Sequence, residues 1–180
     1  MDDDDARSWS WVIYTTPQKP GGVPNGVETG EGGESVPIGV IRLVPPPHPP
    51  HETLVNPNPN RPDGGEGGWD LTHEPYIKLT RVAVLPMYRG LGVSRRLVEM
   101  ALEWARGHAG EIEAAYARVA GTRKEWSGLV MVHAQSEVEG VYTRQGFTTD
   151  KRLGRWKEEG IEHVGMVRRI DVIHRKTIDQ

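Results

Sequence analysis

The sequence has 180 residues, a formal net charge of −3 from 22 basic and 25 acidic side chains, and no cysteine. The length suits one domain with its own core, and the small net charge argues against a primary role in nucleic-acid binding. The lack of cysteine excludes disulfide scaffolds, thiolate nucleophiles and cysteine-type zinc sites. No apolar run approaches the roughly 18 residues of a membrane helix, and the acidic start is unlike a signal or transit peptide. We therefore expect a cytoplasmic protein, with a nuclear location left open.

Two stretches rich in proline and glycine interrupt the chain, at about residues 17–35 and 45–75, and the second holds nine of the 14 prolines. Neither stretch can bury enough apolar surface to offset its chain entropy. We interpret both as long flexible surface loops within a single domain that spans residues 1–180. The second also carries His48 and His51, but a metal site there would lack a rigid scaffold.

The remaining segments alternate between two kinds of pattern. Runs of β-branched and aromatic residues bounded by breakers predict strands, and apolar residues at helical spacing predict helices. Ser136 and Glu139 have the spacing of a capping box, with Gly146 as the stop of that helix. Strands are expected at residues 9–16, 37–44, 76–85, 129–134, 147–150 and 162–170, and helices from 94 to about 107–110, at 111–120 and at 136–146. This order indicates an α/β (α+β) fold with a mixed sheet.

The segment with the clearest chemical signal is VAVLPMYRGLGVSRRL, residues 82–97. A strand runs into a turn with two glycines, Gly90 and Gly92, and then directly into a helix. Such a turn lets successive backbone N–H groups face one concavity together with the positive end of the helix dipole, which predicts a pyrophosphate site. A Walker loop would need Gly-Lys-Ser/Thr, and a dinucleotide fingerprint would need a third glycine. A tight turn without a ligand remains an alternative.

The same segment resembles motif A of the GCN5-related N-acetyltransferase (GNAT) superfamily, V-x-P-x-Y-R-G-x-G-[IV]-[GA]. Ser94 stands where the family usually has glycine or alanine. Residues 135–147, QSEVEGVYTRQGF, are similar to the family's second signature, with Gln135 on its asparagine and Tyr142 on its tyrosine. The ending at 156–166 is similar to that of ElaA-like acetyltransferases. The resemblance covers about residues 9–169.

The resemblance implies a GNAT-like acyl-CoA N-acyltransferase fold, with a mixed, mostly antiparallel sheet flanked by helices. It also implies an N-acetyltransferase that uses acetyl-CoA as cosubstrate, without a metal. The acetyl group would pass to a primary amine of an unidentified small molecule or peptide, by direct attack in a ternary complex. The implied cofactor-binding residues are Val82, Val84, Arg89, Gly90, Leu91, Gly92, Val93, Ser94, Arg95, Gln135 and Tyr142.

The resemblance makes Tyr142 the candidate general acid, which would protonate the departing thiolate. The base stays open: His163 and Glu159 are candidates from the final hairpin, and water-mediated deprotonation is an alternative. Glu158 and His133 are further candidates, although a buried core role suits His133 better. The position that carries a glutamate base in histone-type members is Lys78 in this sequence.

The family fold usually starts with a strand and two helices that form one wall of the acceptor site, and the resemblance implies that these are lacking here. An alternative function is therefore a catalytically weak CoA-binding or protein-interaction module on a GNAT scaffold. The proline-rich stretch favours the extended geometry that recognition segments use. We expect acetyl-CoA and an amine acceptor as partners, no nucleic acid and no membrane, and a homodimer is an open option.

Overall fold

The computed structural model describes residues 4–15, 35–51, 69–158 and 160–173. One sheet holds all the strands of this part of the chain, in the order β1-β2-β3-β4-β7-β5, with β6 also paired to β7. Only the β3–β4 pair is parallel. The strands are β1 (Trp9–Thr15), β2 (Val36–Val44), β3 (Ile77–Val84), β4 (Leu129–Gln135), β5 (Thr148–Thr149), β6 (Arg155–Glu158) and β7 (Ile161–Arg169). The predicted mixed, mostly antiparallel sheet is confirmed.

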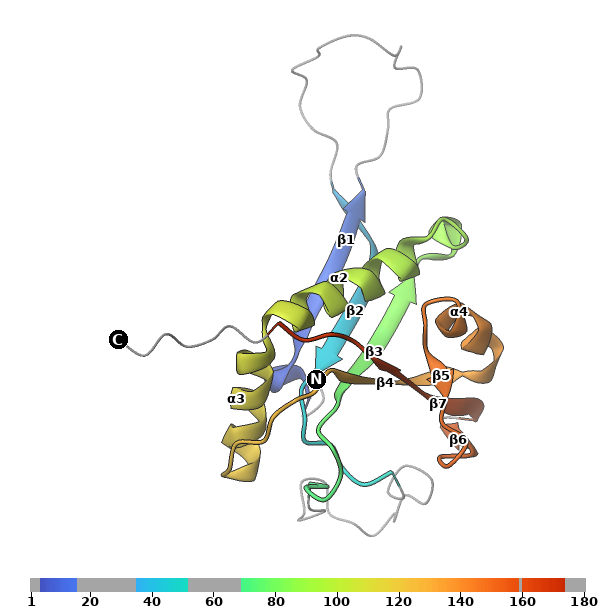
Figure 1. Ribbon diagram of the computed structural model, residues 1–180. Helices are drawn as coiled ribbons and strands as arrows, with labels where there is room; N and C mark the ends of the chain where they lie inside the picture. The colour runs from blue at the N-terminus through green and yellow to red at the C-terminus, as the bar shows by residue number, and fades with distance from the viewer. Residues whose placement is uncertain (1–3, 16–34, 52–68, 159, 174–180) are drawn as a thin grey trace, which may run out of the picture.

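Helices flank this sheet, as expected. They are α2 (Val93–Gly107), α3 (Ala109–Ala120) and the short α4 (Glu139–Thr143), with single 3₁₀ turns η1 (Asp5–Arg7), η2 (Pro86–Tyr88) and η3 (Ser136–Val138). Helix α2 crosses β1, β2 and β3, whereas α4 lies beside β5 (Figure 1). Residues Leu97, Ala101 and Ala105 recur at helical spacing on α2 and are fully buried in the core. Among the described residues, every helix is too short or too polar to cross a lipid bilayer.

The predicted capping box at the start of the α4 region is wrong. No side chain caps this helix, which begins with a 3₁₀ turn instead. The Ser136 hydroxyl donates to Glu162 on β7 at 2.8 Å, and the Glu139 carboxylate binds Arg155 on β6 at 3.1 Å. Partners that are distant in the sequence therefore take both side chains away from the local cap, and strand β6 itself was not predicted.

Strands β3 and β4 are paired only at one end. Their parallel ladder runs from Ile77–Val130 to Leu79–Val132 and stops there, although β3 continues to Val84. Figure 1 shows the two strands diverging beyond this point like the arms of a V, with the start of α2 and α4 on its open side. The position of the candidate site follows from this divergence.

Candidate active site

The gap between β3 and β4 leaves one edge of β3 without a neighbouring strand. Val82 and Val84 lie in this stretch, half-buried, while the opposite edge of β3 pairs with β2 at Gly39–Val84. In this part of the sheet, β3 can therefore pair along its free edge with an extended ligand, as it would with another strand.

A β-bulge bends β3 at the point where it leaves β4. The pairs Val40–Ala83 and Arg42–Thr80 leave Ile41 opposite two residues of β3. One of the two is Arg81, which has φ 51° and is the non-glycine residue with positive φ among the described residues. A bulge increases local twist and bends the strand, so it turns the end of β3 away from β4. Sequence patterns did not reveal it, because arginine gives no signal for a left-handed backbone.

The predicted pyrophosphate site lies at the turn from β3 into α2. Gly90 and Gly92 have φ +77° and +79°, and Gly92 is the residue that precedes the first turn of α2. A Cβ at either glycine would meet nothing within 4 Å, so the turn is open to solvent. Within the described chain, no hydrogen bond of standard geometry engages the backbone N–H groups of residues 90–95. These amides and the helix dipole can bind an anion.

The charged side chains around this turn differ in what they contact. Arg89 is exposed, and its Nε donates to the carbonyl oxygen of Val84 at 3.2 Å, which ties the turn to the end of β3. Arg95 is also exposed and lies 3.8 Å from Glu99. Ser94, the departure from the family pattern, is half-buried. The turn is therefore held in place while cationic groups remain available beside it.

A groove of about 790 Å³ runs along α2 from Arg95 to Arg106, and the turn after α4 lines its other side. Glu99 and Glu103 are its only carboxylates among the described residues. Its arginines are Arg95, Arg96, Arg106, Arg144 and Arg168. This excess of positive charge suits a ligand with several phosphates.

Tyr142 lies half-buried on α4, with its ring edge-on to Phe147 at a centroid distance of 5.6 Å. Burial raises the pKa of Tyr142 from 10.0 to about 12. The phenol therefore keeps its proton at neutral pH and can act as a hydrogen-bond donor or acid.

Gln135 and His163 are cross-strand partners at the end of the β4–β7 ladder, so the structure brings two predicted residues together. The Nδ1 of His163 lies 2.8 Å from the carbonyl oxygen of Ile161. Because a carbonyl oxygen only accepts, Nδ1 carries a proton, and in the neutral imidazole Nε2 holds the lone pair. The other candidate base, Glu159, lies outside the described residues, and Glu158 is exposed at the end of β6.

The face of the sheet opposite α2 carries two further titratable groups, Lys78 on β3 and His133 on β4. Burial is the largest cause that lowers the pKa of His133 to about 2, and the charge of Lys78 adds to it. The Nδ1 of His133 is buried and makes no hydrogen bond with the described residues. His51 and Trp156 pack edge-on against the same imidazole. His133 is therefore held neutral beneath the start of the proline-rich stretch.

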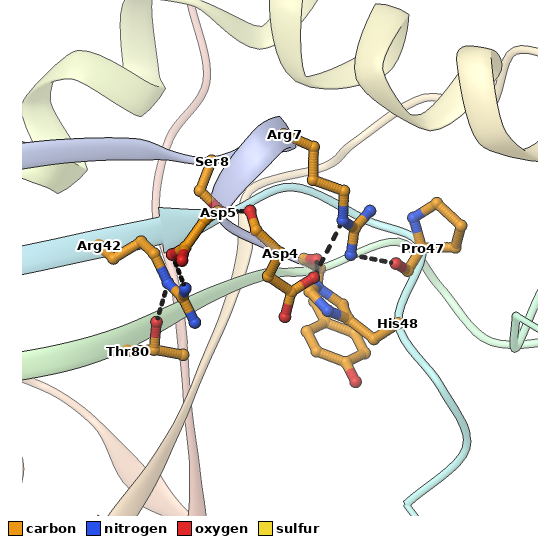
Figure 2. A network of polar contacts seen from close by, with 9 residues as sticks. Asp4, Asp5, Arg7, Ser8, Arg42, Pro47, His48 and Thr80 are labelled. Atoms are coloured by element: carbon orange, nitrogen blue, oxygen red, sulfur yellow. Dashed lines mark hydrogen bonds and ion pairs between the residues drawn. The ribbon is translucent and has the colours of Figure 1, made fainter. Parts of the chain in front are cut away.

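The N-terminal turn η1 fastens this start of the proline-rich stretch to the sheet (Figure 2). Arg7 donates to the carbonyl oxygen of Pro47 at 2.8 Å and pairs with Asp4 at 3.0 Å. Residues 45–48 are buried, and His48 stacks on Tyr76 at 4.4 Å. The second predicted loop is thus packed where it leaves β2, and residues 52–68 lie outside the described part.

The structure thus places the predicted binding residues around one gap, at the end of β3, the following turn, the end of β4 and α4. Among the described residues, no group of three or more histidine, aspartate or glutamate side chains is arranged to hold a metal ion. The bulge at Arg81 and the N-terminal contacts are the features that sequence reasoning missed.

A family model for the acetyltransferase (GNAT) family matches residues 5–125, so the chain belongs to this family of acyltransferases. No curated protein matches it. The chain is similar to a putative N-acetyltransferase from Lactobacillus plantarum, with 19% identity over 74% of this chain and 60% of that one, at a TM-score of 0.43. Escherichia coli ElaA gives 18% identity over 73% and 60%, at 0.42. Arabidopsis thaliana NAA60, in complex with a bisubstrate analogue, gives 12% over 74% and 64%, at 0.44. The chain spans about 60% of the length of the first two.

Proposed function

We propose that this chain transfers an acetyl group from acetyl-CoA to a primary amine of a small molecule or peptide, in one ternary complex. The observation that carries the proposal is the gap between β3 and β4, which opens beside the unengaged amides of the turn before α2. An extended ligand with a pyrophosphate at one end fits this arrangement. Its extended part would pair with the free edge of β3, and its pyrophosphate would bind the amides of the turn that follows.

Each predicted residue has a binding role in this proposal. The amides from Gly90 to Ser94 would hold the pyrophosphate, with Arg89 and Arg95 adding positive charge. The backbone of Val82 and Val84 would pair with the pantetheine arm, and Gln135 would donate a hydrogen bond to it from the opposite arm of the V. Acetyl-CoA would supply the activated thioester when bound.

The catalytic roles follow from the protonation states. The amine nitrogen attacks the thioester carbon, the carbon–sulfur bond breaks, and the amine loses one proton. His163 would accept this proton at Nε2, and Tyr142 would donate its phenolic proton to the departing sulfur. An N–H of β3 would stabilise the carbonyl oxygen as it gains charge. Most of the acceleration would come from holding amine and thioester together, worth up to about 7–11 kcal/mol in well-aligned cases.

Release of free coenzyme A from acetyl-CoA in the presence of a panel of amines tests the proposal. We expect Tyr142→Phe to lower kcat by roughly 10²- to 10⁴-fold with little change in KM, because the phenol acts on the leaving group. Tyr14→Phe is the matched control, since Tyr14 is 58% exposed on the edge strand β1. Unchanged kcat in Tyr142→Phe, or no turnover with any amine, would contradict the proposal and favour a CoA-binding module.

A further inference from the structure

Lys78 lies where the β3–β4 ladder ends. It pairs with Met131, one step before the last pair, Leu79–Val132. Leu79 and Val132 face the core beneath α2, so the alternation of the strand places Lys78 on the opposite face. The side chain is half-buried. The position of Lys78 on β3 is thus beside the start of the gap that the proposed thioester would enter.

Two acidic groups of the N-terminal segment, Asp4 and Asp5, are already engaged by arginines, as Figure 2 shows. Asp5 binds the Arg42 guanidinium at 2.5 Å, and Asp4 binds Arg7 at 3.0 Å. In the part of the chain that the structure describes, the side chain of Lys78 makes neither a hydrogen bond nor an ion pair. Lys78 is therefore an amine that no described contact holds in place.

The other titratable groups that face Lys78 do not hold its amine in the protonated form. Burial keeps His48 and His133 neutral, because it lowers their pKa values to about 3 and about 2. Glu158 raises the pKa of Lys78 but less than burial lowers it, so the net shift is downward. A lysine with a lowered pKa has a larger fraction of neutral amine, which is the nucleophilic form.

We propose that Lys78 is an intramolecular acceptor, so that the protein acetylates its own Nζ. This inference rests on the proposed binding of acetyl-CoA in the gap. The Nζ lone pair attacks the thioester carbon, the carbon–sulfur bond breaks, and an amide forms at Nζ. The amine proton goes to water, and the sulfur takes a proton from Tyr142. Acetylation removes one positive charge from the face that an ammonium acceptor would approach.

The test is incubation of the full chain with isotopically labelled acetyl-CoA, followed by peptide mapping by mass spectrometry. Exposed Lys151 and Lys157 report non-enzymatic acetylation in the same sample. We expect label at Lys78 to appear at least about tenfold faster than at either control lysine, because the reaction is intramolecular. The initial rate should not depend on protein concentration. Lys157→Arg should leave labelling of Lys78 unchanged.

Two variants separate this inference from the proposed function. Gly92→Asp, which places a carboxylate at the pyrophosphate site, should abolish labelling of Lys78 and spare the control lysines. Lys78→Arg should remove the label at that site while free amines are still acetylated. If the wild-type chain acetylates free amines but labels Lys78 no faster than Lys157, the inference is wrong and the proposed function stands. If the folded chain binds no acetyl-CoA, both are overturned.

Discussion

The contact of Arg42 with the N-terminal turn gives the most quantitative prediction of the structure. Arg42 is 6% exposed; its guanidinium donates to Asp5 at 2.5 Å and to Thr80, the residue before the bulge, at 2.9 Å. Hydrogen bonds to charged groups contribute about 1.5–3 kcal/mol each. In Arg42→Met, the apolar stem still packs, and the Asp5 side chain, 29% exposed, regains water. We therefore expect a loss of about 2–4 kcal/mol in the free energy of unfolding.

Urea unfolding followed by tryptophan fluorescence measures this loss. Arg95→Met is the control, because Arg95 and Glu99 form an ion pair in which the side chains are 69% and 51% exposed, and exposed pairs contribute less than about 1 kcal/mol. Thr80→Val removes only the hydroxyl that accepts from Arg42, whereas Thr80→Ser keeps a hydroxyl and should retain this hydrogen bond. Equal losses in Arg42→Met and Arg95→Met, both under about 1 kcal/mol, would refute the reasoning.

Two further predictions concern backbone and pH. Gly128 and Gly154 both have positive φ, +88° and +67°, but only at Gly128 would a Cβ overlap the carbonyl oxygen of Ile170. In thermal denaturation, Gly154→Ala should cost about 1 kcal/mol and Gly128→Ala more than about 3 kcal/mol; similar losses would contradict the overlap. Burial lowers the pKa of His48 from 6.5 to about 3. Between pH 6.5 and about pH 3, the unfolded chain therefore binds a proton at His48 and the folded chain does not. Stability is then full above pH 6.5, and His48 lowers it by about 2 kcal/mol at pH 5. Buried His133, whose pKa is lowered to about 2, lowers it by a similar amount, so His48→Gln should about halve this dependence in urea titrations; an unchanged slope would contradict the role of His48.

Local sequence signals predicted the strand, turn and helix around Gly90 and Gly92, because glycine spacing and helical periodicity both act over a few residues. The resemblance of residues 135–147 to the family's second signature predicted Gln135 as a site residue, and Gln135 is the last residue of β4. Its pairing with His163 depends on the register of two strands that are distant in the sequence. The structure supplies this pairing, and patterns in the chain do not.

The features that sequence reasoning missed depend on tertiary contacts. The acidic start gave no sequence signal for a contact with the sheet, yet Asp5 pairs with the buried Arg42. The left-handed backbone of Arg81 follows from the bulge, where one residue of β2 lies opposite two residues of β3. No residue type in the sequence predicts this bulge. The capping box failed because Ser136 and Glu139 found partners on β6 and β7.

Calorimetric titration of the folded chain with acetyl-CoA tests the central claim most directly, with NADH and ATP as control ligands. Gly92→Asn and Gly92→Asp are a matched pair, since both residues tolerate a left-handed backbone and only aspartate adds a negative charge. A charge about 4 Å from a phosphate near the protein surface is worth about 1–4 kcal/mol. We predict selective binding of acetyl-CoA that Gly92→Asp weakens at least about tenfold more than Gly92→Asn. Equal affinities in the two variants, or no binding by the folded wild-type chain, would contradict the claim that this turn holds the pyrophosphate.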